Sequence, residues 1–144
     1  MPTPLTYPQF LLRQFNGNAI NFDTDAIKVM ILTNAYTYNA AHDFINDCNA
    51  NEVSGTGYTA GGQAISGVTV ALDGTTVEFI HNDLTWTQNA GGFANGRWFI
   101  WYKDTGTPST SPVIMRMQES ADFGNVAGDV ILDGSAATGV LNIA

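Results

Sequence analysis

The sequence predicts an all-β fold, either an antiparallel β-sandwich or a jelly-roll-like barrel, with one short helix near the N-terminus. From residue 27 onward, most apolar residues recur at every second position, which is the period of a strand with one buried face. The segments with this period are short and turn formers separate them, while helical periodicity is confined to one stretch. The 144 residues have the length of one domain, and we expect residues 1–144 to form a single β-rich unit.

The helix is predicted within residues 1–20, over the stretch YPQFLLRQF. Pro8 suits a first helical turn because its missing N–H has no partner there. Gly17 is placed to end the helix. We interpret residues 1–20 as an arm that attaches the domain to a partner. The apolar stripe of this helix consists of Phe10, Leu11 and Phe15.

Strand periodicity is clear in VTVALD and TVEFI, which the dipeptide Asp73-Gly74 joins as a predicted hairpin. Val77 and Phe79 are expected to point into the core and Glu78 to point outward. The segment RWFIWYK is apolar on both faces, so we expect the N-terminal helix, another part of the chain or a partner subunit to cover its second face. Further strands are predicted from IKVMILT, LTWT, VIMRMQ, DVILDG and GVLNI.

Residues 34–63 have no clean period and contain many loop formers. Irregular stretches of this length are usually functional or ordered by a neighbour, so we interpret this one as a docking region. The overlapping segment SGTGYTAGGQAISG has the span of a phosphate-binding loop from Gly57 to Gly62, but Gln63 stands where such a loop needs lysine. Glycine permits positive φ and close backbone approach, which suits a contact with another subunit. The candidate contact residues in this region are Tyr36, Tyr38, Gly55, Gly57, Tyr58, Gly61 and Gly62.

Charged residues are scarce and mostly acidic. They make up 12% of the chain, against about 25% in an ordinary domain, and the net charge is −8. An acidic surface repels phosphate groups, which argues against nucleic acid and anionic membranes as partners. Neutral polar groups cost less to desolvate than ions, so this surface suits packing against other proteins. The N-terminal stretch has neither the basic nor the apolar region of a signal peptide.

No residue pattern predicts catalysis, a cofactor site or a metal site, so we expect a protein that is not an enzyme. Cys48 is the only cysteine in the sequence and is interpreted as a small buried filler. His42 and His81 are expected at the surface or in loops, and they form no zinc pattern. Asp23 and Asp25 have only the first step of a calcium motif. Two binding alternatives stay open, a structural calcium ion and a glycan held by tyrosine side chains.

Several stretches carry a family resemblance, above all ANEVSGTGYTAGGQAISGVTV, then EFIHNDLTWT, WFIWYKDTGTPSTSPVI and the closing GDVILDGSAATGVLNI. From Lys28 to the C-terminus, the chain resembles a family of small structural proteins from the virions of tailed bacteriophages. The N-terminal YPQFLLRQF is more variable than the rest, which fits a partner-specific arm. The stretch GFANGRWF is longer and more aromatic than the family pattern.

This resemblance implies a non-enzymatic virion protein, most directly a capsid decoration or cement protein that binds the outer capsid surface and stabilises the shell. The implied partners are the major capsid protein and further copies of the chain, as a homotrimer at the threefold positions of the shell or as another homo-oligomer. The implied location is the capsid surface, after assembly in the host cytoplasm. The alternatives are a tail-tube or head–tail connector component, and a tail-associated receptor- or glycan-binding protein that uses Tyr36, Tyr38 and Tyr58.

Overall fold

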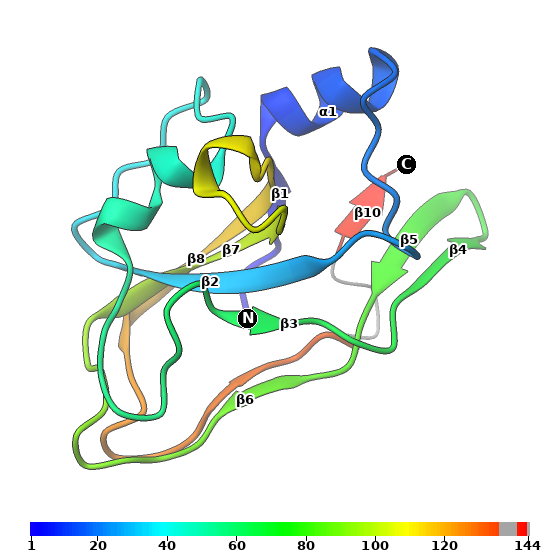
Figure 1. The fold of residues 1–144 in the computed structure, drawn as a ribbon. Coiled ribbons are helices and arrows are strands. Elements are labelled where there is room, and N and C mark those ends of the chain that lie inside the picture. Colours follow the sequence, from blue (N-terminus) through cyan, green and yellow to red (C-terminus); the bar gives the residue numbers. More distant parts are fainter. Residues whose placement is uncertain (136–140, 144) are drawn as a thin grey trace.

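The computed structural model describes residues 1–135 and the backbone of residues 141–143, and it confirms an all-β fold with one short α-helix (Figure 1). In the described residues the antiparallel sheets stay separate, with five, three and two strands, so the barrel alternative is not formed. The predicted strand GVLNI is present from Leu141 onward, and residues 139 and 140 lie outside the described residues. The elements are β1 (Leu5–Thr6), α1 (Pro8–Phe15), β2 (Ile27–Thr33), β3 (Gln63–Ala64), β4 (Thr69–Asp73), β5 (Thr76–Ile80), β6 (Leu84–Trp86), β7 (Gly96–Lys103), β8 (Val113–Phe123), β9 (Val130–Leu132) and β10 (Leu141–Ile143), with short 3-10 turns at Ile45–Asp47, Asn49–Asn51 and Pro108–Thr110.

The five-stranded sheet has the order β1-β8-β7-β2-β3 and contributes most of the core. β7 is its central strand, and all residues of β7 are buried except Arg97 and Lys103. Each end of the sheet is formed by a strand of two residues, β1 or β3. The sheet is therefore long and apolar in its middle and short at its edges, and β1 covers only two of the eleven residues of β8.

Both faces of β7 are covered by other parts of the same chain, which was one of the predicted alternatives. On one face residues 34–52 lie over the sheet, where Tyr36 packs edge-on against Trp98 with ring centroids 5.3 Å apart. On the opposite face lies the two-stranded sheet β6–β9, with Trp86 against Phe99 at 5.9 Å. Figure 1 shows these two layers on either side of β2. Because the chain covers both faces itself, this strand needs no partner subunit to be buried.

The helix α1 begins at Pro8, as predicted, and Gly17 follows it with φ +79°. One residue of its apolar stripe lies in the core, and the other two lie at the surface. Phe10 is 2% exposed and belongs to the core, so the expectation that it is an exposed partner contact is wrong, and it contributes only to the floor of the groove described below. Leu11 and Phe15 stay at the surface, and Phe15 is 87% exposed.

The strands β4 and β5 form the predicted hairpin at Asp73-Gly74, in unbroken register. Gly74 has φ +59°, as the first loop residue of a type II′ turn requires. Phe79 is buried as predicted, but Val77 is 44% exposed and every residue of β4 is exposed. The expectation that Val77 points into the core is therefore wrong, because no layer of the described chain covers this part of the hairpin.

His81 lies in a loop after β5, as predicted, but it is buried rather than exposed. Its Nδ1 is 2.6 Å from the carbonyl oxygen of Asn82, and its Nε2 accepts a hydrogen bond of 3.1 Å from Nε1–H of Trp101. A carbonyl on one side and an N–H donor on the other require the neutral ring with its proton on Nδ1. Burial lowers the pKa of His81 below its usual 6.5.

Candidate partner-binding groove

An apolar groove lies between α1 and the β4–β5 hairpin, and it has a volume of about 280 Å³. One wall is the surface side of the helix and the other is the uncovered face of the hairpin. These two elements are far apart in sequence, so the groove exists only in the folded chain. The residues that line it are Phe10, Leu11, Gln14, Phe15, Phe22, Val70, Val77 and Phe79.

The floor of the groove is aromatic. Phe22 lies between two buried rings, edge-on to Phe10 with centroids 5.9 Å apart and tilted against Phe79 at 4.6 Å. Leu11, Phe15, Val70 and Val77 are exposed above this floor. Packed aromatic rings hold their positions well and present a large apolar area, so the groove is shaped to receive apolar side chains.

Gln14 is the one polar side chain among the described residues that line the groove. Its Oε1 accepts a hydrogen bond of 2.6 Å from the backbone N–H of Ile20, and its Nε2 donates to the carbonyl oxygen of Ile20 at 3.3 Å. Both ends of the amide are therefore bonded within the chain. Recognition in this groove depends on the burial of apolar surface and on shape, since no free polar side chain is available to orient a ligand.

The helix wall is tied to the irregular region by specific contacts. Arg13 on α1 pairs with Asp43, with its Nη2 and Nε donating to Oδ1 at 2.6 and 3.0 Å. Before the helix, the hydroxyl groups of Tyr7 and Tyr36 are hydrogen-bonded at 2.8 Å in the interior. Tyr36 and Asp43 therefore help to hold α1 in place.

The tyrosines predicted as contacts are largely used inside the chain. Tyr36 is buried, so its assignment as a partner contact is wrong. Tyr38 is half-buried, with the guanidinium of Arg116 3.6 Å from its ring centre. Tyr58 is half-buried, and its hydroxyl donates to Glu52 at 2.7 Å. These three rings do not form an open stacking platform, and the glycan alternative stays a prediction.

The glycine-rich segment fits closely against its own chain. A Cβ on Gly62 would lie 1.9 Å from the carbonyl oxygen of Val29 in β2, and one on Gly55 would lie 2.5 Å from the backbone of Gly92. Gly57, Gly61 and Gly62 all have positive φ. The glycines are thus explained by backbone packing within the fold, and a contact of this segment with a partner stays a prediction.

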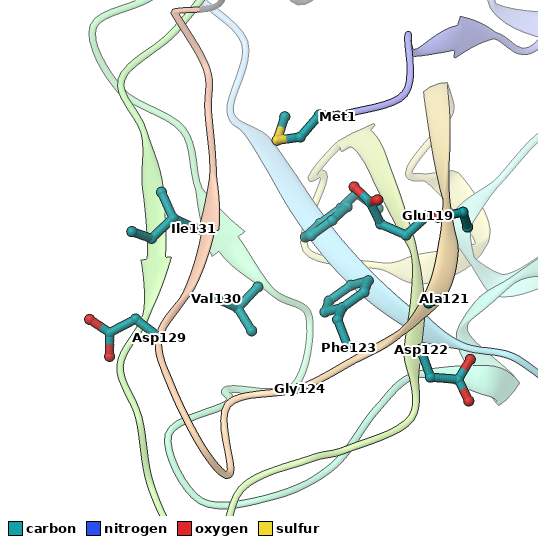
Figure 2. Close-up of a pocket in the computed structure, with 11 residues that line it drawn as sticks. Met1, Glu119, Ala121, Asp122, Phe123, Gly124, Asp129, Val130 and Ile131 are labelled. Carbon is teal, nitrogen blue, oxygen red and sulfur yellow. The ribbon is translucent and has the colours of Figure 1, made fainter.

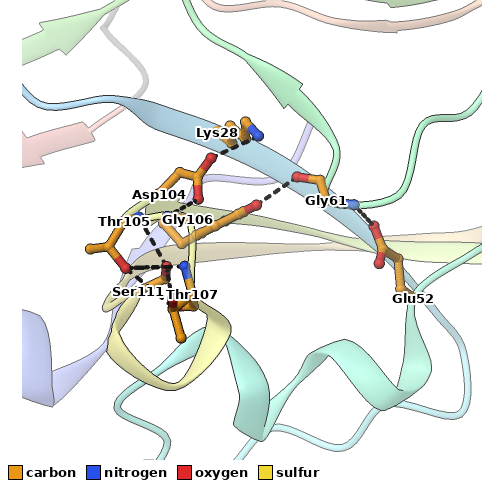
Figure 3. A network of polar contacts seen from close by, with 9 residues as sticks. Lys28, Glu52, Gly61, Asp104, Thr105, Gly106, Thr107 and Ser111 are labelled. Carbon is orange, nitrogen blue, oxygen red and sulfur yellow. Dashed lines mark hydrogen bonds and ion pairs between the residues drawn. The ribbon is translucent and has the colours of Figure 1, made fainter.

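A polar network joins this segment to the sheet (Figure 3). Glu52 accepts a second hydrogen bond, from the backbone N–H of Gly61 at 2.7 Å, and Gly61 in turn accepts from the hydroxyl of Tyr102 at 2.7 Å. Nearby, Lys28 and Asp104 form an ion pair of 2.7 Å. The hydrogen bond with Lys28 lowers the pKa of Asp104, so this carboxylate is ionised at neutral pH.

Cys48 is buried, as predicted for a filler residue. Its Sγ lies 3.6 Å from the hydroxyl of Tyr36 and 3.8 Å from Nδ1 of His42, which is half-buried in its loop. Burial raises the pKa of the Cys48 thiol, so the thiol is protonated at neutral pH. Because the thiolate is the reactive form of cysteine, this arrangement stabilises the interior and does not activate the sulfur.

A second pocket, of about 370 Å³, lies between the end of β8 and β9 (Figure 2). Phe123 and Val130 point into it, while the carboxylates of Asp122 and Asp129 point away from each other. Asp122 pairs with Arg97 at 2.9 Å, and Asp129 accepts a hydrogen bond of 2.7 Å from the backbone N–H of Gln88. These acidic groups are already bonded within the fold. Within the part of the chain that the structure describes, no group of three His, Cys, Asp or Glu side chains could hold a metal ion.

Comparison with known protein families, curated proteins and solved structures finds no match to this chain. In the residues that the structure describes, no helix has the length and apolar character needed to cross a membrane. The family resemblance therefore stays a prediction.

The groove was only partly foreseeable. Leu11 and Phe15 were predicted as contacts, and they lie in it at the surface. Val70 and Val77 were not identified, because alternating apolar residues in a strand look the same whether a layer covers them or not. Phe22 was not identified because it lies in a turn outside any predicted element. The sequence contained one signal that could have drawn attention to Val70 and Val77. It predicts more apolar strand faces than it predicts layers to bury those faces.

Proposed function

We propose that this chain is a non-enzymatic structural protein of a tailed-phage virion, and that it acts as a capsid decoration or cement protein. The observation that carries the proposal is the apolar groove between α1 and the β4–β5 hairpin, on a chain in which 12% of the residues are charged. Contiguous exposed apolar surface on a folded domain marks a site of protein contact. The proposed occupant is an apolar segment of the major capsid protein.

The architecture supports this role. The main sheet is covered on both faces by its own chain, so the core is complete before the domain meets a partner. A cement protein needs such a scaffold and an exposed contact surface, and it needs no catalytic group. On a repeating shell, many modest contacts of this kind add up through multivalency, which would stabilise the capsid against internal pressure. The resemblance to small virion proteins is the reason for proposing that the partner is a capsid.

The location is tested by immunogold labelling of intact virions with an antibody against this chain. Label spread over the head is the expected result. Label confined to the tail would overturn the cement role and favour the tail-tube, connector or receptor-binding alternatives.

The groove is tested with two matched variants on α1, Phe15→Ser and Leu12→Ser. Both side chains are exposed, by 87% and 53%, but Leu12 does not line the groove. Co-sedimentation with capsids that lack the protein should show at least about tenfold weaker binding for Phe15→Ser, because apolar anchors dominate contact energies. Leu12→Ser should bind like the parent chain. Equal binding by both variants would show that the groove is not the docking site.

A further inference from the structure

Within the described residues, the outer edge of β4 is unpaired along its whole length and has no bulge. The outer edge of β8 beyond Arg116 also lacks a partner strand there, but a register shift with β7 interrupts it and it carries Glu119 and Asp122. The three-stranded sheet has the order β10-β5-β4, so β4 pairs with β5 on one side only. The strands at the ends of the other described sheets have two or three residues, whereas β4 has five, all of them exposed. An unpaired strand of this length presents backbone groups that another strand can bind.

The hairpin geometry shows which groups those are. Asp73 and Thr76 flank the two-residue turn and form a hydrogen-bonded pair, and such pairs alternate along an antiparallel ladder. Thr69, Ala71 and Asp73 therefore direct their N–H and C=O groups toward β5. Val70 and Leu72 direct theirs outward, toward the free edge.

This edge also lacks the features that usually prevent pairing. Natural edge strands carry lysine, proline or a bulge, but β4 has the sequence TVALD and its register with β5 is continuous. Its exposed apolar side chains, Val70 and Leu72, are accompanied on the neighbouring strand by Val77. The outward backbone groups of this edge are therefore unpaired, and its apolar side chains are uncovered.

We propose that β4 pairs with β4 of a second copy of this chain, antiparallel and about a twofold axis at Ala71. In this register Val70 lies opposite Leu72 of the second copy, and Leu72 lies opposite its Val70. Both are hydrogen-bonded pairs, so every outward-directed backbone group of Val70 and Leu72 finds a partner. The two hairpins then form one continuous sheet. This inference does not depend on the proposed virion role.

Charge placement favours a second copy as the occupant. In the twofold register the only charged residue of β4, Asp73, lies opposite Thr69 of the second copy, so no two carboxylates face each other directly. The apolar side chains of Val70 and Leu72 meet their counterparts across the junction. A twofold contact uses the same patch on both copies, and this strand is complementary to itself in both hydrogen bonding and charge.

The contact should be weak and should strengthen with salt. A strand of five residues is roughly 17 Å long, which buries less than the ~800 Å² per partner of a standard stable interface. Each copy also carries a net charge of −8, so the two repel each other at low ionic strength. We expect a dimer that forms reversibly as protein concentration and salt increase. It differs from the trimer that the threefold positions of a shell would suggest.

Sedimentation velocity of the purified full chain over a range of concentrations, with and without added salt, tests the dimer. Leu72 is the residue to change, because it is 71% exposed and does not line the groove. Leu72→Pro removes an outward N–H, and Leu72→Glu places a charge in the apolar junction. Each should weaken dimerisation at least about tenfold. Ile131→Glu, at a site 56% exposed on β9, makes the same charge change elsewhere and should leave the dimer intact.

Hydrogen exchange supplies a second readout that does not rely on variants. As the protein is concentrated, the amides of Val70 and Leu72 should exchange more slowly, while the amide of Ala71, already bonded to β5, should change little. A monomer at all concentrations and salt levels, a trimer, or a dimer that tolerates both Leu72 variants would overturn the proposal. Capsid binding through the groove is measured separately with the Phe15 variant, so failure of either idea can be told from failure of the other.

Discussion

The strands β7 and β4 have similar apolar character but opposite surroundings. β7 is buried on both faces, between residues 34–52 and the β6–β9 sheet, whereas β4 is exposed along its whole length. β7 is paired on both sides, and β4 on one side only. The comparison teaches that apolar side chains in a strand are not by themselves enough to bury it. The described chain covers and pairs β7 on both sides, but it leaves one edge of β4 unpaired and its side chains exposed. We call these two regions the enclosed sheet and the open hairpin, and the predictions below compare equivalent changes in each.

The largest effect is expected for Gly62→Ala, next to the enclosed sheet. The new Cβ would lie 1.9 Å from the carbonyl oxygen of Val29, and φ is +77°. Positive φ costs about 1–2 kcal/mol and overpacking about 1–3 kcal/mol more, so we expect roughly 4 kcal/mol of lost stability in chemical denaturation. Gly74→Ala in the open hairpin, with φ +59° and no atom within 4 Å, should incur the conformational cost alone. Equal losses in the two variants would contradict the close packing of Gly62.

The same close packing means that the glycines beside the enclosed sheet cannot be changed without damage to the fold. Loss of Gly61 and Gly62 should destabilise the domain itself, because Gly62 touches the backbone of β2 and Gly61 bonds to both Glu52 and Tyr102. A loss of assembly in such a variant would therefore say nothing specific about a contact surface.

The next largest loss of stability is expected for Ile100→Ala in β7, and Leu72→Ala in β4 is the matched truncation. Ile100 is fully buried, and removing its side chain should cost about 3 kcal/mol. Leu72 is 71% exposed, so its truncation should change stability by less than about 0.5 kcal/mol. Both values come from urea denaturation at a protein concentration where the chain is monomeric. A cost for Leu72 as large as that for Ile100 would mean that part of the domain covers β4.

A smaller effect is expected from His81, which follows the open hairpin in the chain and bonds to Trp101 of the enclosed sheet. Its folded pKa lies below the unfolded value of 6.5, so the neutral ring stabilises the fold fully above about pH 6.5. As pH falls below that value, the unfolded chain takes up a proton first and this stability is lost. Protonated Nε2 would face the N–H of Trp101 with no acceptor between them.

We expect His81→Gln to cost about 2 kcal/mol at neutral pH and to remove the part of the acid destabilisation that begins near pH 6.5. Denaturation curves of the parent and the variant across this pH range give the comparison. A parent chain whose stability does not decline as pH falls from neutral to below 6.5 would refute the assignment.

The smallest effect is expected from Asp104→Asn, which breaks the partly exposed ion pair with Lys28 on β2. Pairs of this kind contribute about 0.5 kcal/mol. The folded pKa of Asp104 is lowered below 3.8 by its hydrogen bond with Lys28, so this contribution is present above pH 3.8 and is lost as the carboxylate becomes protonated in more acidic solution. Asp73→Asn, at the turn of the open hairpin, is the matched control and should be neutral. Thermal unfolding at low and high salt should show the Asp104 difference shrinking as salt screens the pair.

Local pattern was enough to predict the fold class and most of the elements. The helix from Pro8, the hairpin at Asp73-Gly74 and the doubly covered strand RWFIWYK are all present. The helix and the hairpin depend on interactions between residues close in sequence, such as a proline in a first turn or a glycine at positive φ, whereas the strand was recognised from apolar residues on both of its faces. The candidate groove was predicted only on its helix side, through Leu11 and Phe15.

The sequence by itself therefore determined which segments form strands, where the chain turns and that both faces of β7 are covered. Only the tertiary structure decided that Phe10 and Tyr36 are interior residues, that His81 is buried, and that Val77 is exposed. The physical reason is that alternation records the two faces of a strand, but burial depends on which distant segment packs against each face. The apolar groove and the open edge of β4 are the places where the described chain supplies no such segment.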